Sequence, residues 1–292
     1  MVASRGVAVP LIAVVGATGT GKTALSLALA RQFNGEIIAA DSRTLYKGMN
    51  IGTAKPTLKE QAAIKHYLID ITSPDTPITV AQFKHLANDA IMTIAKRGKV
   101  PFLVGGSGLY IDSVLFDYQF SVPPDPFLRE RLGRLSVEEL QTALLEQGIP
   151  LPENKKNPRY LIRTLETGGT EKQTRLLRDN TLVIGLHVEQ DMLYNRISRR
   201  VDAMVSAGFV EEVRKLAETY GWDNEPMRAP GYKAFREYIE GAVSLDEAKA
   251  AFIKNDLQLA KRQRTWFRRN KDIHWVETRD ETVDLITTFL NK

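Results

Sequence analysis

The chain has 292 residues, 43% hydrophobic and 26% charged, which is enough for one large α/β core and a smaller appended unit. It has no cysteine, which excludes disulfides, zinc–thiolate sites and thiol nucleophiles. It has no uncharged apolar run of about 18 residues that could cross a bilayer as a helix. We therefore expect a cytoplasmic protein with no membrane partner. The net charge of +5 favours a polyanionic partner, but only weakly.

Short apolar, β-branched runs recur along the chain and predict buried strands. These runs are residues 11–15, 36–40, 67–71, 101–104, 181–186 and 273–276. Segments between several of them, such as 23–33 and 80–97, have helical periodicity. Strands alternating with helices predict a doubly wound parallel sheet.

A glycine-rich segment connects the first predicted strand to the first predicted helix. Its residues are Gly16, Ala17, Thr18, Gly19, Thr20, Gly21, Lys22 and Thr23. In the pattern G-x-x-x-x-G-K-[ST], backbone N–H groups and a helix N-terminus surround phosphate oxygens, while Lys22 adds positive charge and Thr23 is a magnesium ligand. The alternative is a glycine turn without a ligand. The fold class we predict is α/β, a P-loop NTPase-like parallel sheet core with a mainly helical insertion.

The predicted core spans residues 1–118 and continues in strands near 180–188 and 272–278. Residues 119–178 and 191–254 are rich in charges and helix formers, and we expect a mainly helical elaboration there. A basic helix and the last core strand follow in 255–292. The sequence does not decide which helical block forms a separate lobe.

The residue best placed for chemistry is Asp41, which follows the second predicted strand. Ligands of open α/β sheets bind at the carboxyl ends of the strands, so this carboxylate is expected beside the phosphate loop. There it could accept a proton from an attacking amine or hydroxyl. The alternatives are a helix N-cap or an outer-shell contact to magnesium. Asp70 lies at the end of the third predicted strand, one residue before its last, so the sequence leaves open which aspartate serves magnesium.

Several segments together resemble the tRNA dimethylallyltransferase family, also called tRNA isopentenyltransferase or IPP transferase. They are GATGTGKT at 16–23, DSRTLYKGMNIGTAKP at 41–56, VGGSGLY at 104–110, GYK at 231–233 and AKRQRTWFR at 260–268. The resemblance covers nearly the whole chain. Ser107 stands where the family usually has threonine, which keeps the hydroxyl, and Ala17 replaces a usual proline without removing a donor.

The resemblance implies transfer of a dimethylallyl group from dimethylallyl diphosphate to N6 of the adenine immediately 3′ of the anticodon, with release of diphosphate. The implied RNA partner is the anticodon stem-loop of tRNAs that read codons beginning with U. Asp41 would be the base, Lys22, Thr23 and Mg²⁺ would stabilise the departing diphosphate, and Arg200 would close on it. We expect a monomer.

The resemblance also implies a set of tRNA-binding residues. They are Asp41, Ser42, Arg43, Thr44, Ser107, Arg129, Arg159, Arg163, Gly231, Tyr232, Lys233, Lys261, Arg264 and Arg268. If residues 252–269 form one helix, Phe252, Leu259 and Trp266 share one face. Lys261, Arg264 and Arg268 then lie on the opposite face. An aligned row of cations suits a phosphate backbone, although a solvated helix face is the alternative for each such residue.

Three other functions remain open at this point. A prenyltransferase acting on free adenine nucleotides would share the phosphate loop but would leave the basic residues without a polyanion. A small-molecule kinase or NTPase would turn over ATP without a prenyl donor. An RNA-binding protein whose loop only senses nucleotide would bind tRNA and leave the adenine unaltered. The four histidines are scattered without metal-ligand spacing, and we predict structural roles for them.

Overall fold

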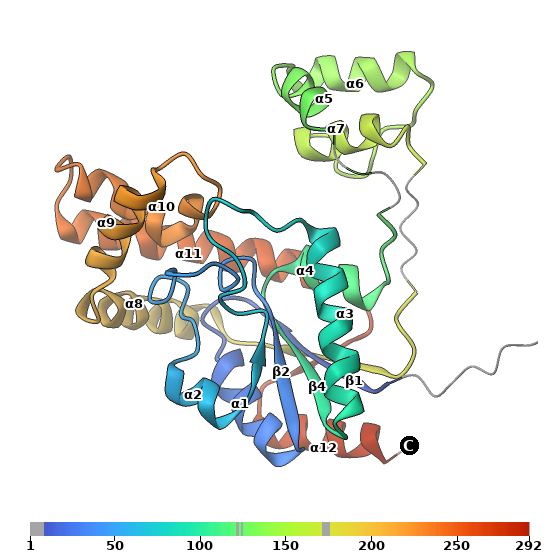
Figure 1. The fold of residues 1–292 in the computed structure, drawn as a ribbon, viewed down its shortest axis with the longest axis vertical. Coiled ribbons are helices and arrows are strands. Elements are labelled where there is room, and N and C mark those ends of the chain that lie inside the picture. Colours follow the sequence, from blue (N-terminus) through green and yellow to red (C-terminus); the bar gives the residue numbers. More distant parts are fainter. Residues whose placement is uncertain (1–8, 121–122, 124, 171–175, 292) are drawn as a thin grey trace, which may run out of the picture. The chain divides into compact units, whose positions relative to one another are not determined.

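The structure is a computed structural model that describes residues 9–120, 123, 125–170 and 176–291 (Figure 1). The chain divides into two compact units. The sheet unit comprises Met1–Leu115 and Leu177–Lys292, and the insertion unit comprises Phe116–Leu176. Among the described residues, no helix is both long and apolar enough to span a membrane.

Within its described residues, the sheet unit contains six strands in the order β3-β2-β4-β1-β5-β6, and all neighbours are parallel. The strands are β1 (Leu11–Gly16), β2 (Gly35–Ala40), β3 (His66–Tyr67), β4 (Val100–Gly105), β5 (Thr181–Leu186) and β6 (Ile273–Val276). Gly105 of β4 pairs with both Val15 and Ala40, so β1, β2 and β4 end level with one another. The residues that follow these three strands therefore meet at one edge of the sheet.

The six predicted strands are all present, but the third is much shorter than residues 67–71. β3 ends at Tyr67 because Leu68 and Asp70 take left-handed backbone conformations, with φ of 62° and 55°. The Asp70 carboxylate instead accepts a hydrogen bond from Lys55 Nζ at 2.6 Å. Asp70 is therefore not the last residue of a core strand.

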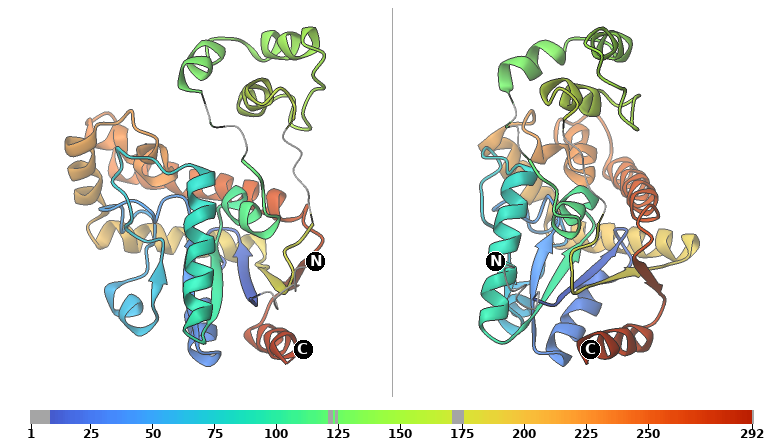
Figure 2. Two further views of the ribbon diagram at one scale, coloured as in Figure 1. Left: turned by 45° about the vertical axis from the view of Figure 1, so that its right-hand side comes forward. Right: turned by 90° about the vertical axis from the view of Figure 1, so that its right-hand side faces the viewer.

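Helices cover both faces of the sheet, as expected from its strands, whose residues are mostly buried (Figures 1 and 2). On one face, α1 (Lys22–Gln32) and α12 (Arg279–Leu290) bury Leu29 and Ile286 against alternate strand residues such as Ile12. α3 (Val80–Lys96) packs against β2 and β4 on the other face. Two short helices, α2 (Leu58–Ala63) and α4 (Gly108–Leu115), follow the loops after β2 and β4.

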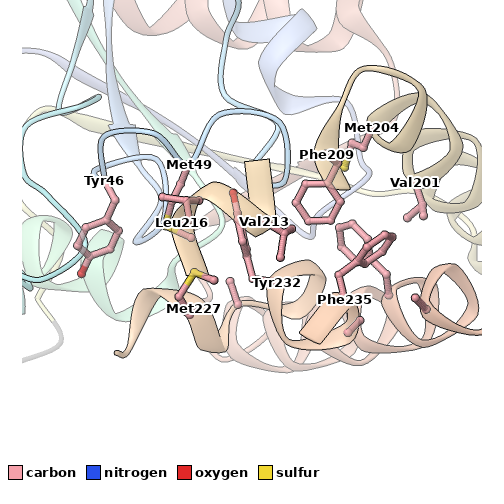
Figure 3. Close-up of a cluster of buried hydrophobic side chains, with 14 residues drawn as sticks. Tyr46, Met49, Val201, Met204, Phe209, Val213, Leu216, Met227, Tyr232 and Phe235 are labelled. Atoms are coloured by element: carbon pink, nitrogen blue, oxygen red, sulfur yellow. The ribbon is translucent and has the colours of Figure 1, made fainter. Parts of the chain in front are cut away.

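Four further helices and a 3₁₀ turn complete the sheet unit. They are α8 (Gln190–Ser206), α9 (Phe209–Tyr220), η1 (Pro226–Arg228), α10 (Pro230–Ile239) and α11 (Leu245–Phe267). Their shared core includes Phe209, Tyr232 and Phe235, and Figure 3 shows Tyr46 and Met49 of the loop after β2 in the same cluster. Because this core joins the helices to that loop, residues 191–254 belong to the sheet unit and not with 119–178.

The insertion unit contains α5 (Pro126–Leu132), α6 (Val137–Glu146) and α7 (Pro158–Glu166). Each helix begins at a polar cap whose side chain accepts backbone hydrogen bonds, at Asp125, Ser136 and Asn157. Its small core is formed by Leu132, Leu140, Leu144, Ile149 and Leu161. Among its described residues the unit has helices and no strand, as the sequence predicted.

Candidate active site

A cavity of about 990 Å³ lies at the edge of the sheet where β1, β2 and β4 end. Its lining comes from the phosphate loop, the loops after β2 and β4, and helices α8, α10 and α11, all within the sheet unit. The side chains include more cations than carboxylates. The cations are Lys22, Arg43, Lys55, Arg196, Arg200, Arg228, Lys233 and Arg262, and the carboxylates are Asp41, Glu60 and Asp256. The cavity is large enough for a small anionic ligand and part of a second substrate.

The phosphate loop has the geometry of an anion site. Gly19 and Gly21 have φ of 79° and 94°, conformations that favour glycine. Gly21 caps α1 without a side-chain hydrogen bond, so the first N–H groups of α1 are available to an anion. Thr18, Gly19, Gly21, Lys22 and Thr23 line the cavity. The other predicted loop residues, Gly16, Ala17 and Thr20, are buried behind it.

Lys22 is held inside the loop, where its Nζ donates to the Ala17 carbonyl at 2.6 Å. Burial lowers the pKa of Lys22 to about 8; the Asp41 carboxylate opposes this shift, and the nearby Arg200 cation adds to it. An anion bound in the loop would supply the opposite charge that Lys22 lacks.

Asp41 is fixed by hydrogen bonds on both sides of it. Its Oδ1 accepts from the Arg43 N–H at 2.8 Å, the Ser42 N–H donates to Ser107 Oγ at 2.9 Å, and the Ser107 N–H donates to the Ala40 carbonyl at 3.2 Å. This is a turn after β2, so Asp41 is not a helix N-cap. Within the described part of the chain, no donor bonds to Oδ2, and the carboxylate lines the cavity.

Two residues that follow Asp41 have partners within the protein. The Arg43 guanidinium is paired with the Glu225 carboxylate, with Nη2 donating to Oε1 at 2.8 Å and Nη1 to Oε2. Thr44 is buried, and its hydroxyl donates to the Asp41 carbonyl at 3.3 Å. Arg43 would have to exchange Glu225 for RNA in order to make the predicted contact.

The predicted Arg200 enters the cavity from α8 and is paired with Asp256 of α11. The neighbouring Arg196 donates from Nη1 to the Thr20 carbonyl at 3.2 Å, so α8 places one guanidinium on the phosphate loop and a second in the cavity lining. Sequence reasoning missed Asp256 and Arg196. Asp256 could have been noticed, because it is a carboxylate on the buried stripe that contains Phe252 and Ala260.

Helix α11 runs from Leu245 to Phe267, so nearly all of the segment 252–269 lies in one helix. Gln263 bridges it to two loops: its Oε1 accepts the Thr18 N–H at 2.8 Å, and its Nε2 donates to the Gly106 carbonyl at 3.0 Å. Trp266 Nε1 donates to Asp112 at 2.8 Å. Sequence reasoning did not assign this bridging role to Gln263.

The two predicted faces of α11 differ in their surroundings. Phe252 is buried, and Leu259 and Trp266 are half-buried at the cavity. Lys261 and Arg268 are exposed and Arg264 is half-buried, and all three lie outside the cavity lining. The basic row is therefore placed to meet a partner outside the cavity.

The predicted GYK segment is divided by helix α10. Gly231 and Lys233 line the cavity. Tyr232 points into the aromatic core, is fully buried, and donates its hydroxyl to Glu212 at 2.7 Å (Figure 3). The prediction that Tyr232 contacts RNA is wrong for its side chain, because successive helix residues point in directions about 100° apart.

Three predicted RNA contacts lie in the insertion unit, where two of them share one carboxylate. Arg129 donates to Glu166 at 2.6 and 2.9 Å, and Arg163 Nη1 donates to Glu166 at 3.2 Å. Arg159, at the start of α7, is exposed.

Magnesium is compatible with the loop when a phosphate ligand shares its coordination. Thr23 places a hydroxyl at the cavity, and Mg²⁺ in proteins commonly combines one or two protein oxygens with substrate phosphates and waters. Among the described residues there is no group of three or more His, Asp or Glu side chains that could hold a metal ion on its own. Asp70, which pairs with Lys55, does not line the cavity.

The glycine-rich loop between β1 and α1, facing a cavity with Asp41, defines an α/β protein of the P-loop class with a site for a phosphorylated ligand. The sequence profile of the IPP transferase family matches residues 44–270. The chain belongs to this family, which confirms the resemblance found in the sequence.

Relatives and solved structures agree with this membership. The chain is 42% identical over 286 residues to a tRNA dimethylallyltransferase of Anoxybacillus flavithermus, covering 94% of this chain and 92% of the relative. It is 45% identical to another from a Roseiflexus species, covering 89% and 90%.

The full-length tRNA isopentenylpyrophosphate transferase of Bacillus halodurans has a similar structure, with a TM-score of 0.74, 36% identity, and coverage of 97% of this chain and 96% of that one. A eukaryotic dimethylallyltransferase acting on tRNA gives a TM-score of 0.76 at 25% identity, covering 92% and 73%. These likenesses confirm the predicted fold class.

Proposed function

We propose that this chain is a prenyltransferase that moves a dimethylallyl group from dimethylallyl diphosphate to N6 of the adenine immediately 3′ of the anticodon. The substrates are tRNAs that read codons beginning with U, and the second product is diphosphate. The observation that supports this most is that the Asp41 carboxylate and the phosphate loop line one cavity, in a chain of the IPP transferase family. One cavity can therefore hold both substrates, with a proton acceptor for the adenine amine and a binding site for the leaving diphosphate.

The phosphate loop would bind the diphosphate of the donor. As the bond between the allylic carbon and the diphosphate oxygen breaks, its electron pair and negative charge pass to the diphosphate. Lys22, Arg200 and the N–H groups at the start of α1 would stabilise that charge. Since these groups are held by the fold before the reaction, they need little rearrangement as the charge develops.

The adenine amine would attack the allylic carbon, and Asp41 would take one of its protons. The new bond forms between N6 and that carbon, and the proton moves to the carboxylate. Ser107 and the turn at Ser42 would keep the carboxylate in place for this step. In this proposal Thr44 acts from behind the turn, through its bond to the Asp41 carbonyl.

A dry wall is needed because an allylic carbon with cationic character reacts readily with water. The cavity provides apolar surface from Leu109, Phe252, Leu259 and Trp266. Trp266 is fixed by its bond to Asp112, so this wall has a defined position. We propose that these side chains surround the prenyl group.

Magnesium, with Thr23 and diphosphate oxygens as ligands, would add positive charge on the leaving group. The Thr23 hydroxyl and the Lys22 ammonium would then contact the same diphosphate from neighbouring positions.

The anticodon loop suits this site because its bases are unpaired, which lowers the cost of moving one adenine into a pocket. Arg43, Gly231 and Lys233 would contact the RNA at the cavity. Lys261, Arg264 and Arg268, with Arg129, Arg159 and Arg163 of the insertion unit, would meet phosphates. We propose a monomeric enzyme acting where its tRNA substrates are, in the cytoplasm.

The test is transfer of labelled dimethylallyl diphosphate, with magnesium, to unmodified tRNA and separately to AMP, alongside a measurement of ATP hydrolysis. Label on the anticodon-loop adenine alone is the expected result. Label on AMP would instead identify a free-nucleotide transferase, and ATP turnover without prenyl transfer would refute the proposal. RNA binding without any transfer would point to a binding protein.

A further inference from the structure

Arg200 and Asp256 form an ion pair at the inner wall of the cavity, between α8 and α11. The Asp256 side chain is 5% exposed and that of Arg200 is 26% exposed. Asp256 occupies a position on α11 between Phe252 and Ala260, where an apolar side chain would be the stable choice. A buried ion pair is generally no more stable than apolar residues of similar volume, so its presence calls for a functional explanation.

Two nitrogens of the Arg200 guanidinium differ in their hydrogen bonding. Nη2 donates to Asp256 Oδ2, whereas Nε is buried and makes no hydrogen bond with any described residue. A buried N–H without an acceptor is rare, because leaving it unpaired costs about 1–3 kcal/mol. A ligand in the cavity that Arg200 lines could supply this acceptor, and the phosphate loop that lines the same cavity indicates that such a ligand is an anion.

Arg200 also lies close enough to Lys22 for their charges to interact unfavourably, since Arg200 contributes to the lowered pKa of Lys22. Without a counter-charge, this repulsion would favour rotamers that move the flexible arginine toward solvent. Asp256 supplies that counter-charge from behind. Its own pKa is raised, mainly by burial and partly by the Asp41 carboxylate, while Arg200 opposes that rise.

We propose that Asp256 is a positioning residue that holds Arg200 beside the phosphate loop with Nε directed toward the diphosphate of the donor. The proposal rests on the proposed function, because it assigns a diphosphate to that site. The Asp256 carboxylate itself repels an anion, so it can strengthen diphosphate binding only through Arg200. A role confined to holding α8 against α11 would also act through Arg200, so a second ion pair between the same helices is needed to separate the two roles.

The chain provides a matched control for that structural role. Lys249 of α11 pairs with Asp202 of α8 at 2.6 Å, joining the same two helices. Neither residue lines the cavity. Asp202→Asn therefore removes an ion pair between α8 and α11 without touching the proposed diphosphate site.

The experiment is a double-mutant cycle on the full chain, with inorganic diphosphate as the probe and its Kd measured by calorimetry. The variants are Asp256→Asn, Arg200→Ala, the double variant, and Asp202→Asn. We expect Asp256→Asn to weaken diphosphate binding about tenfold, the loss expected for one misplaced charge-assisted hydrogen bond. In the Arg200→Ala background the same change should cause no weakening, and Asp202→Asn should leave Kd within about twofold of the parent.

Equal weakening by Asp256→Asn in both backgrounds would overturn the proposal, as would an unchanged or tighter Kd in the parent background. Failure of the parent chain to bind diphosphate would instead count against the proposed function. In the transfer assay, Asp256→Asn should raise KM for the donor and leave KM for the RNA unchanged. Thermal unfolding checks that each variant is folded, and Asp256→Ser takes the place of Asp256→Asn in the cycle if the latter does not fold.

Discussion

Glu212, in the first turn of α9, accepts three hydrogen bonds from the loop after β2 and one from Tyr232 of α10. Its Oε2 accepts the N–H groups of Asn50 and Ile51 at 2.9 and 2.8 Å. Its Oε1 accepts the Gly52 N–H at 3.0 Å and the Tyr232 hydroxyl at 2.7 Å. In the better orientation of Glu212→Gln, the amide oxygen still accepts from Asn50 and Ile51, and the NH₂ group donates to the Tyr232 hydroxyl oxygen. The bond from the Gly52 N–H is then lost, and the remaining bonds lose the carboxylate charge.

The expected loss follows from these contacts. Hydrogen bonds to a charged group contribute roughly 1.5–3 kcal/mol each when buried. Glu212 is half-buried, so water can replace part of this, and we expect Glu212→Gln to lower the free energy of unfolding by about 2–4 kcal/mol. The neighbouring Glu211 is exposed in the same first turn. Glu211→Gln loses the same interaction with the helix dipole, which amounts to at most about 1 kcal/mol.

Urea unfolding followed by tryptophan fluorescence measures the free energy of unfolding of the sheet unit in both variants. All three tryptophans, Trp222, Trp266 and Trp275, lie in the sheet unit that contains Glu212. The difference between Glu212→Gln and Glu211→Gln isolates the loop contacts from the helix dipole. Equal losses in the two variants would refute the reasoning.

Three further predictions concern charge and close packing. Because the pKa of Lys22 is lowered to about 8, the ammonium of the ligand-free protein loses its proton above that pH. The affinity for diphosphate, measured without magnesium, should therefore fall as pH rises through about 8. Lys22→Arg should show a weaker decline of affinity with pH, and the same decline in both proteins would contradict this prediction. Glu36, 1% exposed, accepts hydrogen bonds from two cations and a tyrosine, so Glu36→Gln should lower the free energy of unfolding by about 1–3 kcal/mol at pH 7. The pKa of Glu36 is lowered in the folded state, so the stability that its carboxylate contributes is present above the unfolded pKa and is lost as pH falls through the folded pKa. In urea unfolding, the difference in free energy of unfolding between Glu36→Gln and the parent should therefore be smaller at pH 4 than at pH 7. Gly105→Ala would place Cβ 2.0 Å from the Ala40 carbonyl oxygen, so it should lower the free energy of unfolding by about 1–3 kcal/mol or more. It should also slow prenyl transfer, because the clash displaces Asp41, the residue after Ala40. Unchanged stability and activity in Gly105→Ala would argue against this packing.

The sequence predicted most of the sheet and the catalytic edge because these features are local. A strand followed by a glycine-rich loop and a helix fixes the place of Lys22 and Thr23. Asp41 follows a buried strand, and parallel strands end at the same edge, so its position beside the loop could also be inferred. Even here β3 was predicted too long, because the left-handed residues Leu68 and Asp70 carry no glycine signal.

The remaining features depend on contacts between distant parts of the chain. Arg200 and Asp256 are separated by 56 residues, and Gln263 bonds to Thr18 across 245 residues. No pattern along the chain specifies such pairs. The burial of Tyr232 has the same origin, because only the packing of α9 and α10 around Phe209 decides which side of α10 faces the core. The RNA contacts of the insertion unit and the magnesium ligand Thr23 stay predictions.

The most direct test of the central claim is single-turnover transfer by the parent chain and by Asp41→Asn, with labelled dimethylallyl diphosphate and an unmodified anticodon stem-loop. RNA binding is measured in parallel for both proteins. We predict that Asp41→Asn binds the RNA nearly as well as the parent and transfers the prenyl group roughly a hundredfold more slowly, as expected for loss of a general base. Transfer at the parent rate by Asp41→Asn would contradict the assignment of Asp41 as the base, and no transfer by the parent chain would contradict the proposed activity.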